Sequence, residues 1–369
     1  MDFFATAAKG TEPALRDELR RLRVRGVRAD RGGVAFTGEL VDGFRVCLWS
    51  RVAVRVMLQL SSFPAPSDGA LYDGVRAIDW QPFLDASRTL VVSAACRSSA
   101  LTHTQFIAQR TKDAIVDQLR DASGARPSVD RDDADVRVFV HLVKDVATVY
   151  VDLAGDPLNR RGFRGHAGEA PLKETLAAAV LLLSGYDGTL PLFDPMCGAG
   201  TIPIEAAMIA RRIAPGSLRA KFACERWRSH GDAETRDFRR LREEAQAGIV
   251  PDPIPVLGGD VDRASLDLAR ENAKRAGVTL QLSAGAIAEA TAPSGACFVV
   301  TNPPYGVRIH GVGDVPRDLG ALVARSPEAT FGVLAGGPDL IRFIKRKPEK
   351  TWVLYNGDIE CRLLRYAPV

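Results

Sequence analysis

Few cysteines and no long apolar run set the first limits on this protein. Only six of its 369 residues are cysteines, and they show neither a C-x-x-C pair nor a Cys/His pair with metal-ligand spacing. A zinc site and a disulfide framework are therefore not indicated. The longest purely apolar run, 176–183, is too short to cross a bilayer, and the first residues lack a basic segment followed by an apolar one. We expect a cytoplasmic protein with reduced thiols, no membrane segment and no metal.

An excess of one charge is also lacking. The chain has 49 Lys and Arg against 45 Asp and Glu, with 46% hydrophobic and 25% charged residues, which excludes a mostly disordered or fibrous protein. Its length predicts two or three domains. Basic residues do gather between Arg16 and Arg31, where Leu15, Leu19 and Leu22 share one face of an expected helix that Gly26 ends. The opposite face of arginines is either solvated or contacts nucleic acid.

The order of expected elements divides the chain in two. Residues 61–79 are rich in Pro, Ser, Gly and Asp and indicate a connecting region. An α+β unit follows. Its expected elements are a strand at 89–95, a helix at 103–120 and a β-hairpin formed by 135–143 and 147–153. The polar, glycine-rich segment 155–168 indicates the main domain boundary. After it, a helix at 171–183 and strands alternating with helices from Leu190 onward predict an α/β domain with a parallel sheet.

The first motif with chemical content follows the expected strand at 192–194. Asp194 ends that strand, and a turn with Gly198 and Gly200 leads into a helix. The two glycines let backbone N–H groups approach a ligand, but the third glycine of the dinucleotide fingerprint is missing. A carboxylate at Asp194 repels a pyrophosphate and accepts hydrogen bonds from an ammonium group. The turn therefore favours a cationic amino-acid ligand, with a plain strand–turn–helix as the alternative.

The second motif, residues 256–262, has an acidic residue at the end of the next expected strand. Asp260 is placed to accept hydrogen bonds from ribose hydroxyls, as such residues do in doubly wound folds. Asp262 is more simply the N-cap of the following helix.

The third motif is Asn302-Pro303-Pro304-Tyr305 after the apolar strand expected at 297–301. The prolines lack N–H donors and fix the backbone, so the Asn302 side-chain oxygen and the Pro303 carbonyl can accept both N–H bonds of an exocyclic amine. Tyr305 offers a stacking face for a flipped base. The pattern favours a site that prepares the amine of a planar base to attack an electrophile, over a merely structural turn.

With these motifs in this order, the chain resembles the THUMP-domain RNA methyltransferases with a class I S-adenosylmethionine fold. The bacterial large-subunit rRNA guanine-N2 methyltransferases are the most similar branch, and a tRNA guanine-N2 branch is a near relative. The resemblance covers essentially the whole chain. The segments that carry it outside the three motifs are 112–117, 126–130, 161–164, 170–174 and 355–363.

The resemblance implies an architecture. A Rossmann-like class I methyltransferase sheet would occupy 169–369, after a ferredoxin-like unit at 1–60, a THUMP RNA-binding unit at 61–155 and a linker at 156–168. It also implies S-adenosylmethionine as cofactor and RNA as partner, with 23S rRNA favoured and tRNA possible. The implied cofactor-binding residues are Asp194, Pro195, Cys197, Gly198, Gly200, Thr201 and Asp260, and the implied catalytic residues are Asn302, Pro303, Pro304 and Tyr305.

Three features depart from the family pattern or stay open. Ala199 stands where the family usually has Ser or Thr, and 283–286 lacks the Asp often found near the adenine. The second departure motivates an alternative, an RNA-binding protein whose methyltransferase fold no longer turns over. The roughly sixty residues between Gly200 and Asp260 exceed the ~20 of one βαβ step. That insertion is either an RNA-contacting lid or a solvated helical excursion.

Overall fold

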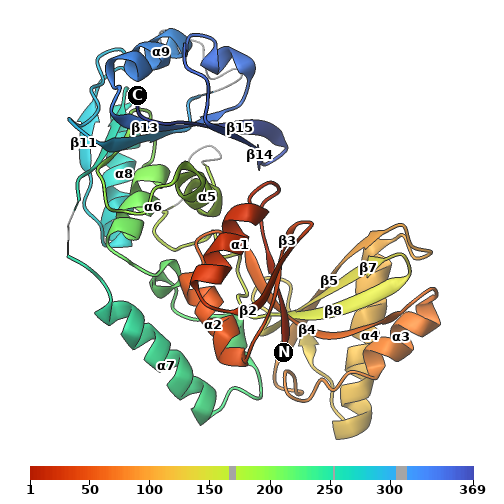
Figure 1. The fold of residues 1–369 in the computed structure, drawn as a ribbon. Helices are drawn as coiled ribbons and strands as arrows, with labels where there is room; N and C mark the ends of the chain where they lie inside the picture. The colour runs from red at the N-terminus through yellow and green to blue at the C-terminus, as the bar shows by residue number, and fades with distance from the viewer. Residues whose placement is uncertain (166–171, 252–253, 305–313) are drawn as a thin grey trace.

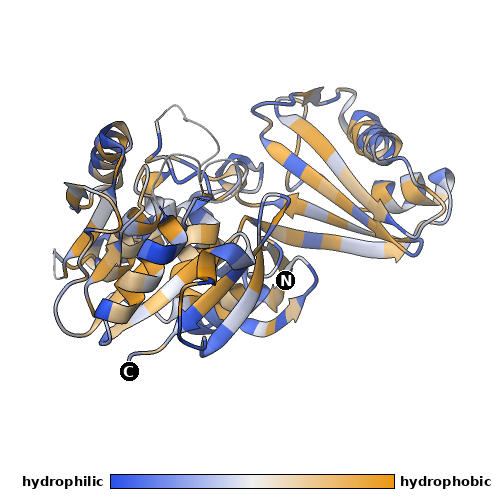
Figure 2. Ribbon diagram, turned by 90° about the horizontal axis from the view of Figure 1, so that it is seen from above, coloured by the Kyte–Doolittle hydropathy of each residue, from blue (hydrophilic) through white to orange (hydrophobic). Residues whose placement is uncertain are grey.

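The protein is built around two β-sheets. The computed structural model describes residues 1–165, 172–251, 254–304 and 314–369. An eight-stranded sheet lies in the N-terminal half and a seven-stranded sheet in the C-terminal half (Figure 1). Apolar residues line the strands of both sheets (Figure 2), and helices pack against them to close the cores.

The N-terminal sheet has the strand order β2-β3-β1-β4-β8-β7-β5-β6. Its strands are β1 (Asp2–Thr6), β2 (Arg25–Asp30), β3 (Gly33–Thr37), β4 (Arg55–Pro64), β5 (Thr89–Arg97), β6 (Ser128–Val129), β7 (Val136–Val143) and β8 (Val146–Asp152). Its helices are α1 (Glu12–Arg21), α2 (Leu40–Trp49), α3 (Asp68–Arg76) and α4 (Thr104–Ser123). The first six elements form a βαββαβ unit, and antiparallel pairing of β4 with β8 joins it to the second unit in one continuous sheet.

The predicted strand, helix and hairpin between 89 and 153 are confirmed by β5, α4, β7 and β8, with Lys144 and Asp145 at positive φ in the hairpin turn. Two other predictions are wrong. The segment 61–79 is not a connection, because it holds the end of β4 and all of α3, whose Ser67 cap accepts a hydrogen bond from the Ala70 N–H. The arginine-rich helix ends at Arg21 and not at Gly26, so Arg25 and Arg28 lie on the edge strand β2.

The C-terminal sheet has the order β11-β10-β9-β12-β13-β15-β14. Its strands are β9 (Leu192–Asp194), β10 (Val256–Asp260), β11 (Gln281–Ala284), β12 (Cys297–Thr301), β13 (Ala329–Ala335), β14 (Lys350–Asn356) and β15 (Ile359–Tyr366). β9 to β13 run parallel, and β15 is antiparallel to β13. The predicted Rossmann-like sheet is thereby confirmed.

Helices cover both faces of this sheet. α5 (Glu174–Ser184), α6 (Thr201–Ala210) and α8 (Arg263–Ala276) share one apolar core, and α9 (Val315–Arg325) packs in a second core. The helix predicted at 171–183 is α5, although Pro171 lies outside the described residues. Because helices cover both faces of the sheet, the sequences of the central strands are continuous apolar runs.

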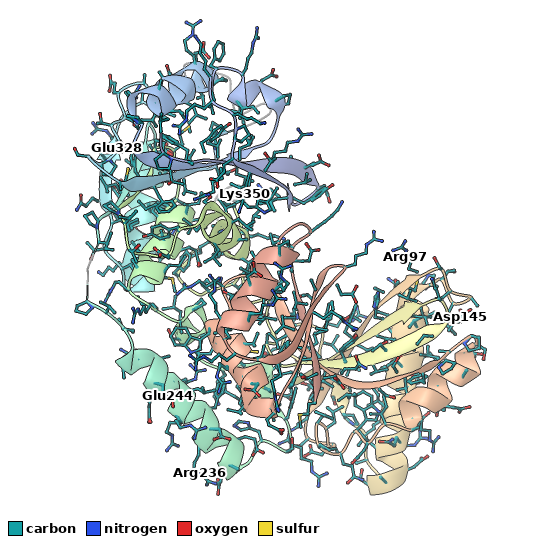
Figure 3. All side chains as sticks on the ribbon, viewed as in Figure 1. Arg97, Asp145, Arg236, Glu244, Glu328 and Lys350 are labelled. Carbon is teal, nitrogen blue, oxygen red and sulfur yellow. The ribbon has the colours of Figure 1, made fainter. Side chains whose placement is uncertain are left out.

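The insertion between α6 and β10 joins the two halves of the molecule. Its helix α7 (Asp232–Ala247) lies against α2 (Figure 1), and it buries Phe238, Leu241 and Ala245 in the N-terminal core. Arg236 and Glu244 lie on the exposed side of the same helix (Figure 3). The prediction of a solvated excursion is therefore wrong, and the packing of α7 on α2 does not fit a lid over the site, whereas contact of its exposed side with RNA stays a prediction.

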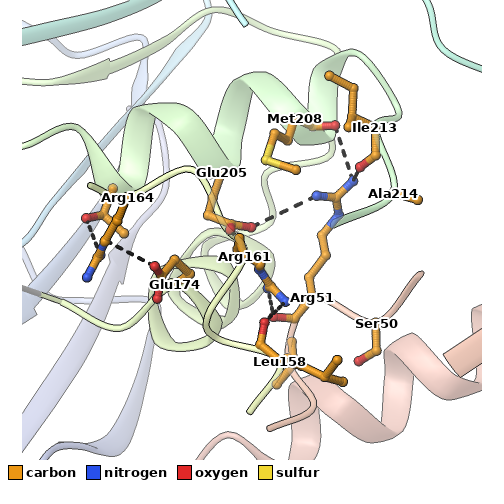
Figure 4. A network of polar contacts seen from close by, with 12 residues as sticks. Ser50, Arg51, Leu158, Arg161, Arg164, Glu174, Glu205, Met208, Ile213 and Ala214 are labelled. Atoms are coloured by element: carbon orange, nitrogen blue, oxygen red, sulfur yellow. Dashed lines mark hydrogen bonds and ion pairs between the residues drawn. The ribbon is translucent and has the colours of Figure 1, made fainter. Parts of the chain in front are cut away.

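A buried ionic network holds the same junction. The Arg161 guanidinium donates to Glu205 on α6 (Nε–Oε1 3.1 Å), and both side chains are almost completely buried (Figure 4). Arg51, which follows α2, donates to the carbonyl oxygens of Met208 and Ile213 beyond Glu205. Because a buried charge is costly without a partner, these contacts fix one relative position of the two halves.

Candidate active site

The three sequence motifs meet at one edge of the C-terminal sheet. β9 is the central strand, with β10 on one side (Gly258 opposite Asp194) and β12 on the other (Val299 opposite Phe193). The strand order reverses at this point, since the chain runs outward from β9 to β11 and returns to β12. Ligands of doubly wound sheets bind outside the carboxyl ends of the strands at such a switch point.

The turn after β9 presents backbone to this edge. Its shape is set by two bonds of Cys197, whose N–H donates to the Gly259 carbonyl and whose carbonyl accepts from the Gly200 N–H (both 2.9 Å). Gly198 has φ +52°, and a Cβ there would meet open space, whereas a Cβ at Gly200 (φ +83°) would lie 2.9 Å from the Ala269 Cβ. Gly200 is therefore needed for packing on α8, and Gly198 leaves room in front of the turn.

Asp194 is a buried carboxyl group beside that turn. Its Oδ1 accepts a hydrogen bond from the Met196 N–H (3.1 Å), and the side chain has almost no contact with solvent. Burial raises the pKa of Asp194 to about 7, against smaller opposing effects of the Thr301 hydroxyl and the Met196 amide. The group can therefore ionise near neutral pH when a cation arrives.

Asp260 connects the turn to β10. Its Oδ2 accepts from the Gly198 N–H (2.8 Å) and its Oδ1 from the Asp262 N–H (3.0 Å). These bonds orient the carboxylate and leave further lone pairs for hydroxyl donors. Asp262 is the N-cap of α8, as predicted, because its carboxylate accepts from the N–H groups of Ala264 and Ser265.

Asn302 follows β12 and carries an unsatisfied acceptor. Its Oδ1 is buried and has no hydrogen-bond partner among the described residues. Buried polar atoms in native proteins normally have a partner, so this carbonyl oxygen is available to a donor that lies beyond the described residues. Pro303 is buried and Pro304 half-buried, while Tyr305 lies outside the described residues.

Other residues that sequence reasoning missed hold this site in place. The Asn272 amide donates to the Ala199 carbonyl (3.1 Å), so α8 also supports the turn. Arg164 donates to the Thr201 hydroxyl (2.7 Å) and pairs with Glu174 (3.1 Å), so that Thr201 is engaged within the protein. Arg164 and Glu174 belong to the sequence motifs 161–164 and 170–174, but the motifs give no sign of these contacts.

An acidic residue that the sequence did not indicate lies near the end of β11, where the family often has an Asp. A Cβ built on Gly285, directly after β11, would lie 3.9 Å from a carboxylate oxygen of Glu289. The Gly285 N–H donates to the Asp260 carbonyl (3.0 Å), so this acidic group is close to the same edge of the sheet.

Comparison with known proteins agrees with this arrangement. The fold is that of a class I methyltransferase preceded by ferredoxin-like and THUMP units. The family model described as RMKL-like, methyltransferase domain, matches residues 161–362, and models for a THUMP domain and an RlmL ferredoxin-like domain match 67–152 and 2–57. The chain belongs to the RMKL-like methyltransferase family.

Individual relatives extend over the whole chain. It is 43% identical over 379 aligned residues to the ribosomal RNA large subunit methyltransferase K/L of Methylococcus capsulatus, covering 99% of this chain and 51% of that protein. SMU.472, a methyltransferase solved in complex with SAH, has 30% identity and a TM-score of 0.89 over 98% of its chain. A predicted N6-adenine-specific DNA methylase from Listeria monocytogenes has 30% identity and a TM-score of 0.90 over 96% of its chain.

The extent of these matches differs between the two kinds of relative. The chain spans about half the length of the curated relatives it matches, whereas it covers nearly all of the solved structures.

Within the described ranges, no helix has the length and apolar character needed to cross a membrane. The described residues likewise contain no group of three His, Cys, Asp or Glu side chains suited to a metal ion.

Proposed function

We propose that the protein transfers a methyl group from S-adenosylmethionine to the exocyclic N2 of a guanosine in structured RNA, with 23S rRNA as the substrate. The observation that carries the proposal is the meeting of three groups at adjacent strand ends. These are the buried carboxyl of Asp194, the uncovered backbone at Gly198 and the unpartnered Oδ1 of Asn302.

The residues at this edge suit S-adenosylmethionine by their chemistry. A buried Asp194 that can ionise near pH 7 is a partner for the ammonium of the methionine part, and Gly198 lets that part lie against the turn. Asp260, held by two N–H groups, accepts from the ribose hydroxyls. Pro195, Cys197, Gly200 and Thr201 shape the turn. Glu289 is an acceptor for the adenine amino group in place of the absent Asp.

Asn302 and Pro303 are the residues proposed to act on the target amine. S-adenosylmethionine supplies a methyl group on a sulfonium, which is already a good electrophile. The carbonyl oxygens of Asn302 and Pro303 would accept the two N–H bonds of the amine and direct its lone pair at the methyl carbon. The N–C bond forms as the S–C bond breaks, and the nitrogen then loses a proton to water. Orientation supplies most of the acceleration in such a step.

The N-terminal half is proposed to hold the RNA by its shape and backbone, because RNA helices expose few base edges. The units would be a ferredoxin-like unit at 1–60 and a THUMP unit at 61–155, with a linker at 156–168 before the methyltransferase domain at 169–369. Their junction is rigid through α7 and the Arg161–Glu205 pair, so RNA held by one half has a fixed position relative to Asn302. The printed names of the curated relatives favour 23S rRNA over tRNA.

Asn302→Ala tests the proposal against a binding-only protein. The variant should lose at least about 100-fold in methyl transfer to 23S rRNA, because a positioning group is removed. Its affinity for SAH should stay unchanged, as measured by calorimetry. The matched control is Gln246→Ala, which removes an exposed side-chain amide on α7. Wild-type transfer by Asn302→Ala would contradict the role of Asn302, and a wild-type protein without SAH affinity would favour the binding-only alternative.

A further inference from the structure

A cavity of about 500 Å³ lies between the two halves of the molecule. The N-terminal half contributes the loop 6–9 after β1 and Val54, and the segment between the halves contributes Asn159. The C-terminal half contributes the start of α5 and the turn 355–358 between β14 and β15. Of these residues, Lys173 belongs to the sequence motif 170–174 and the turn 355–358 to the motif 355–363, and neither motif has been assigned a role so far.

Close contacts across the junction fix the walls of this cavity. The Lys9 ammonium lies 3.7 Å from the centre of the Tyr355 ring. A Cβ on Gly10 (φ +90°) would lie 2.1 Å from the Val353 carbonyl oxygen, so only glycine permits this approach of the loop to β14. On the other side, Asn159 follows Leu158, whose carbonyl accepts from the buried Arg161. The cavity is therefore part of a built junction.

The polar groups that line the cavity suit an anion flanked by hydroxyls. Lys9 and Lys173 are exposed and make no ion pair with any described residue, and Asp358 is the acidic residue among the lining. Thr175 is 2% exposed, and its hydroxyl has no hydrogen-bond partner in the described parts of the chain. The N-terminus of α5, which begins at Glu174, adds N–H groups and a positive helix dipole at the same place.

The cavity lies on the same edge of the sheet as the candidate active site. Glu174, between the lining residues Lys173 and Thr175, is paired with Arg164, which also donates to Thr201 at the start of α6. In the antiparallel pair of β13 and β15, Ala335 at the end of β13 lies opposite Arg362, so the turn 355–358 lies beyond the carboxyl end of β13. The start of α5 and the turn 355–358 therefore lie at the edge of the sheet that carries the candidate active site.

We propose that this cavity binds the sugar–phosphate of a nucleotide next to the target guanosine. The inference rests on the proposed function, because it takes the substrate to be RNA. Lys9 and Lys173 pair with the phosphate, and the Thr175 hydroxyl donates to a phosphate or ribose oxygen. Holding the neighbouring nucleotide at the domain junction keeps the flipped base in register with Asn302.

The test compares Lys173→Gln and Thr175→Val with Lys274→Gln, a control at the end of α8 on the opposite edge of the sheet. The probe is an unmodified 23S rRNA transcript, with binding measured over a range of salt concentrations. Lys173→Gln should bind about tenfold more weakly at 0.1 M salt, and its slope of log K against log salt should fall by about 1. Thr175→Val should bind at least about tenfold more weakly. KM for the RNA should rise in both variants, with kcat and SAH affinity unchanged.

The outcomes separate this inference from the function on which it rests. If the wild-type protein methylates the transcript and both variants bind it like Lys274→Gln, the cavity is not an RNA site and the proposed function stands. If the wild-type protein binds the transcript without methylating it, the binding comparison still decides the cavity. A wild-type protein that does not bind the transcript overturns both. Unchanged SAH affinity shows in each case that the variant is folded.

Discussion

The buried carboxyl of Asp194 makes a quantitative prediction about stability. Its pKa is about 7 in the folded protein and about 3.9 in an unfolded chain. Between these values the folded state holds a proton that the unfolded state has lost, so the free energy of unfolding falls as the pH rises from about 4 to 7. The two pKa values differ by about 3, which corresponds to a loss of about 4 kcal/mol above pH 7.

Asp194→Asn removes this loss while keeping an acceptor for the Met196 N–H. The variant should be more stable than the wild type at pH 8 by up to about 4 kcal/mol, and its advantage should grow by about 3 kcal/mol from pH 5 to pH 8. Urea unfolding of both proteins at each pH measures the difference between their free energies of unfolding. The contributions of the other titrating groups are the same in both proteins and cancel in this difference. The matched control is Asp262→Asn, because hydrogen bonds from Ser265 and Ala264 lower the pKa of that exposed carboxyl.

The same variant tests the ammonium partner. SAH affinity of the wild type should fall about tenfold for each pH unit below 7, since Asp194 must lose its proton first. Asp194→Asn should bind SAH at least about tenfold more weakly at pH 8, because a charge-assisted hydrogen bond is lost. A variant whose stability advantage does not grow with pH would refute the burial argument. A variant that keeps wild-type SAH affinity at pH 8 would refute the binding role.

Three further predictions concern the junction, the turn and the adenine side. Glu205→Gln should lower the free energy of unfolding by about 3–5 kcal/mol in urea, since it leaves Arg161 buried without its counter-charge. Gly198→Ala and Gly200→Ala should both lower the melting temperature, because both glycines have positive φ, and Gly200→Ala should lower it more because its Cβ also meets Ala269. Gly198→Ala should in addition weaken SAH binding, because its Cβ points into the open space in front of the turn. Glu289→Gln should weaken SAH binding by calorimetry, and an unchanged affinity would show that another group meets the adenine.

Local patterns were sufficient to predict the ends of the strands that form the site. Asp194, Asp260 and Asn302 each close an apolar strand, and a doubly wound sheet brings such ends to one edge. The N-cap role of Asp262 could likewise be predicted from its immediate neighbours in the sequence. The segment 61–79 was misread because its turn-forming residues include Ser67, which caps a helix, and because Leu71 and Val75 alone show its buried face.

Contacts between distant parts of the chain could not be read from the sequence. The pattern of Phe238 and Leu241 shows that α7 buries one face, but not that the face meets α2 in the other half of the molecule. Arg161 and Glu205 are 44 positions apart, and nothing in their surroundings marks them as partners. The carboxylate of Glu289 lies in a loop without regular spacing, so only the structure places it near Gly285.

Nucleoside mass spectrometry of a 23S rRNA transcript, after incubation with the protein and S-adenosylmethionine, tests the central claim most directly. The account predicts N2-methylguanosine in the digest, its loss with Asn302→Ala, and no such product from bulk tRNA under the same conditions. Methylation of adenosine, or transfer to tRNA in place of 23S rRNA, would contradict it.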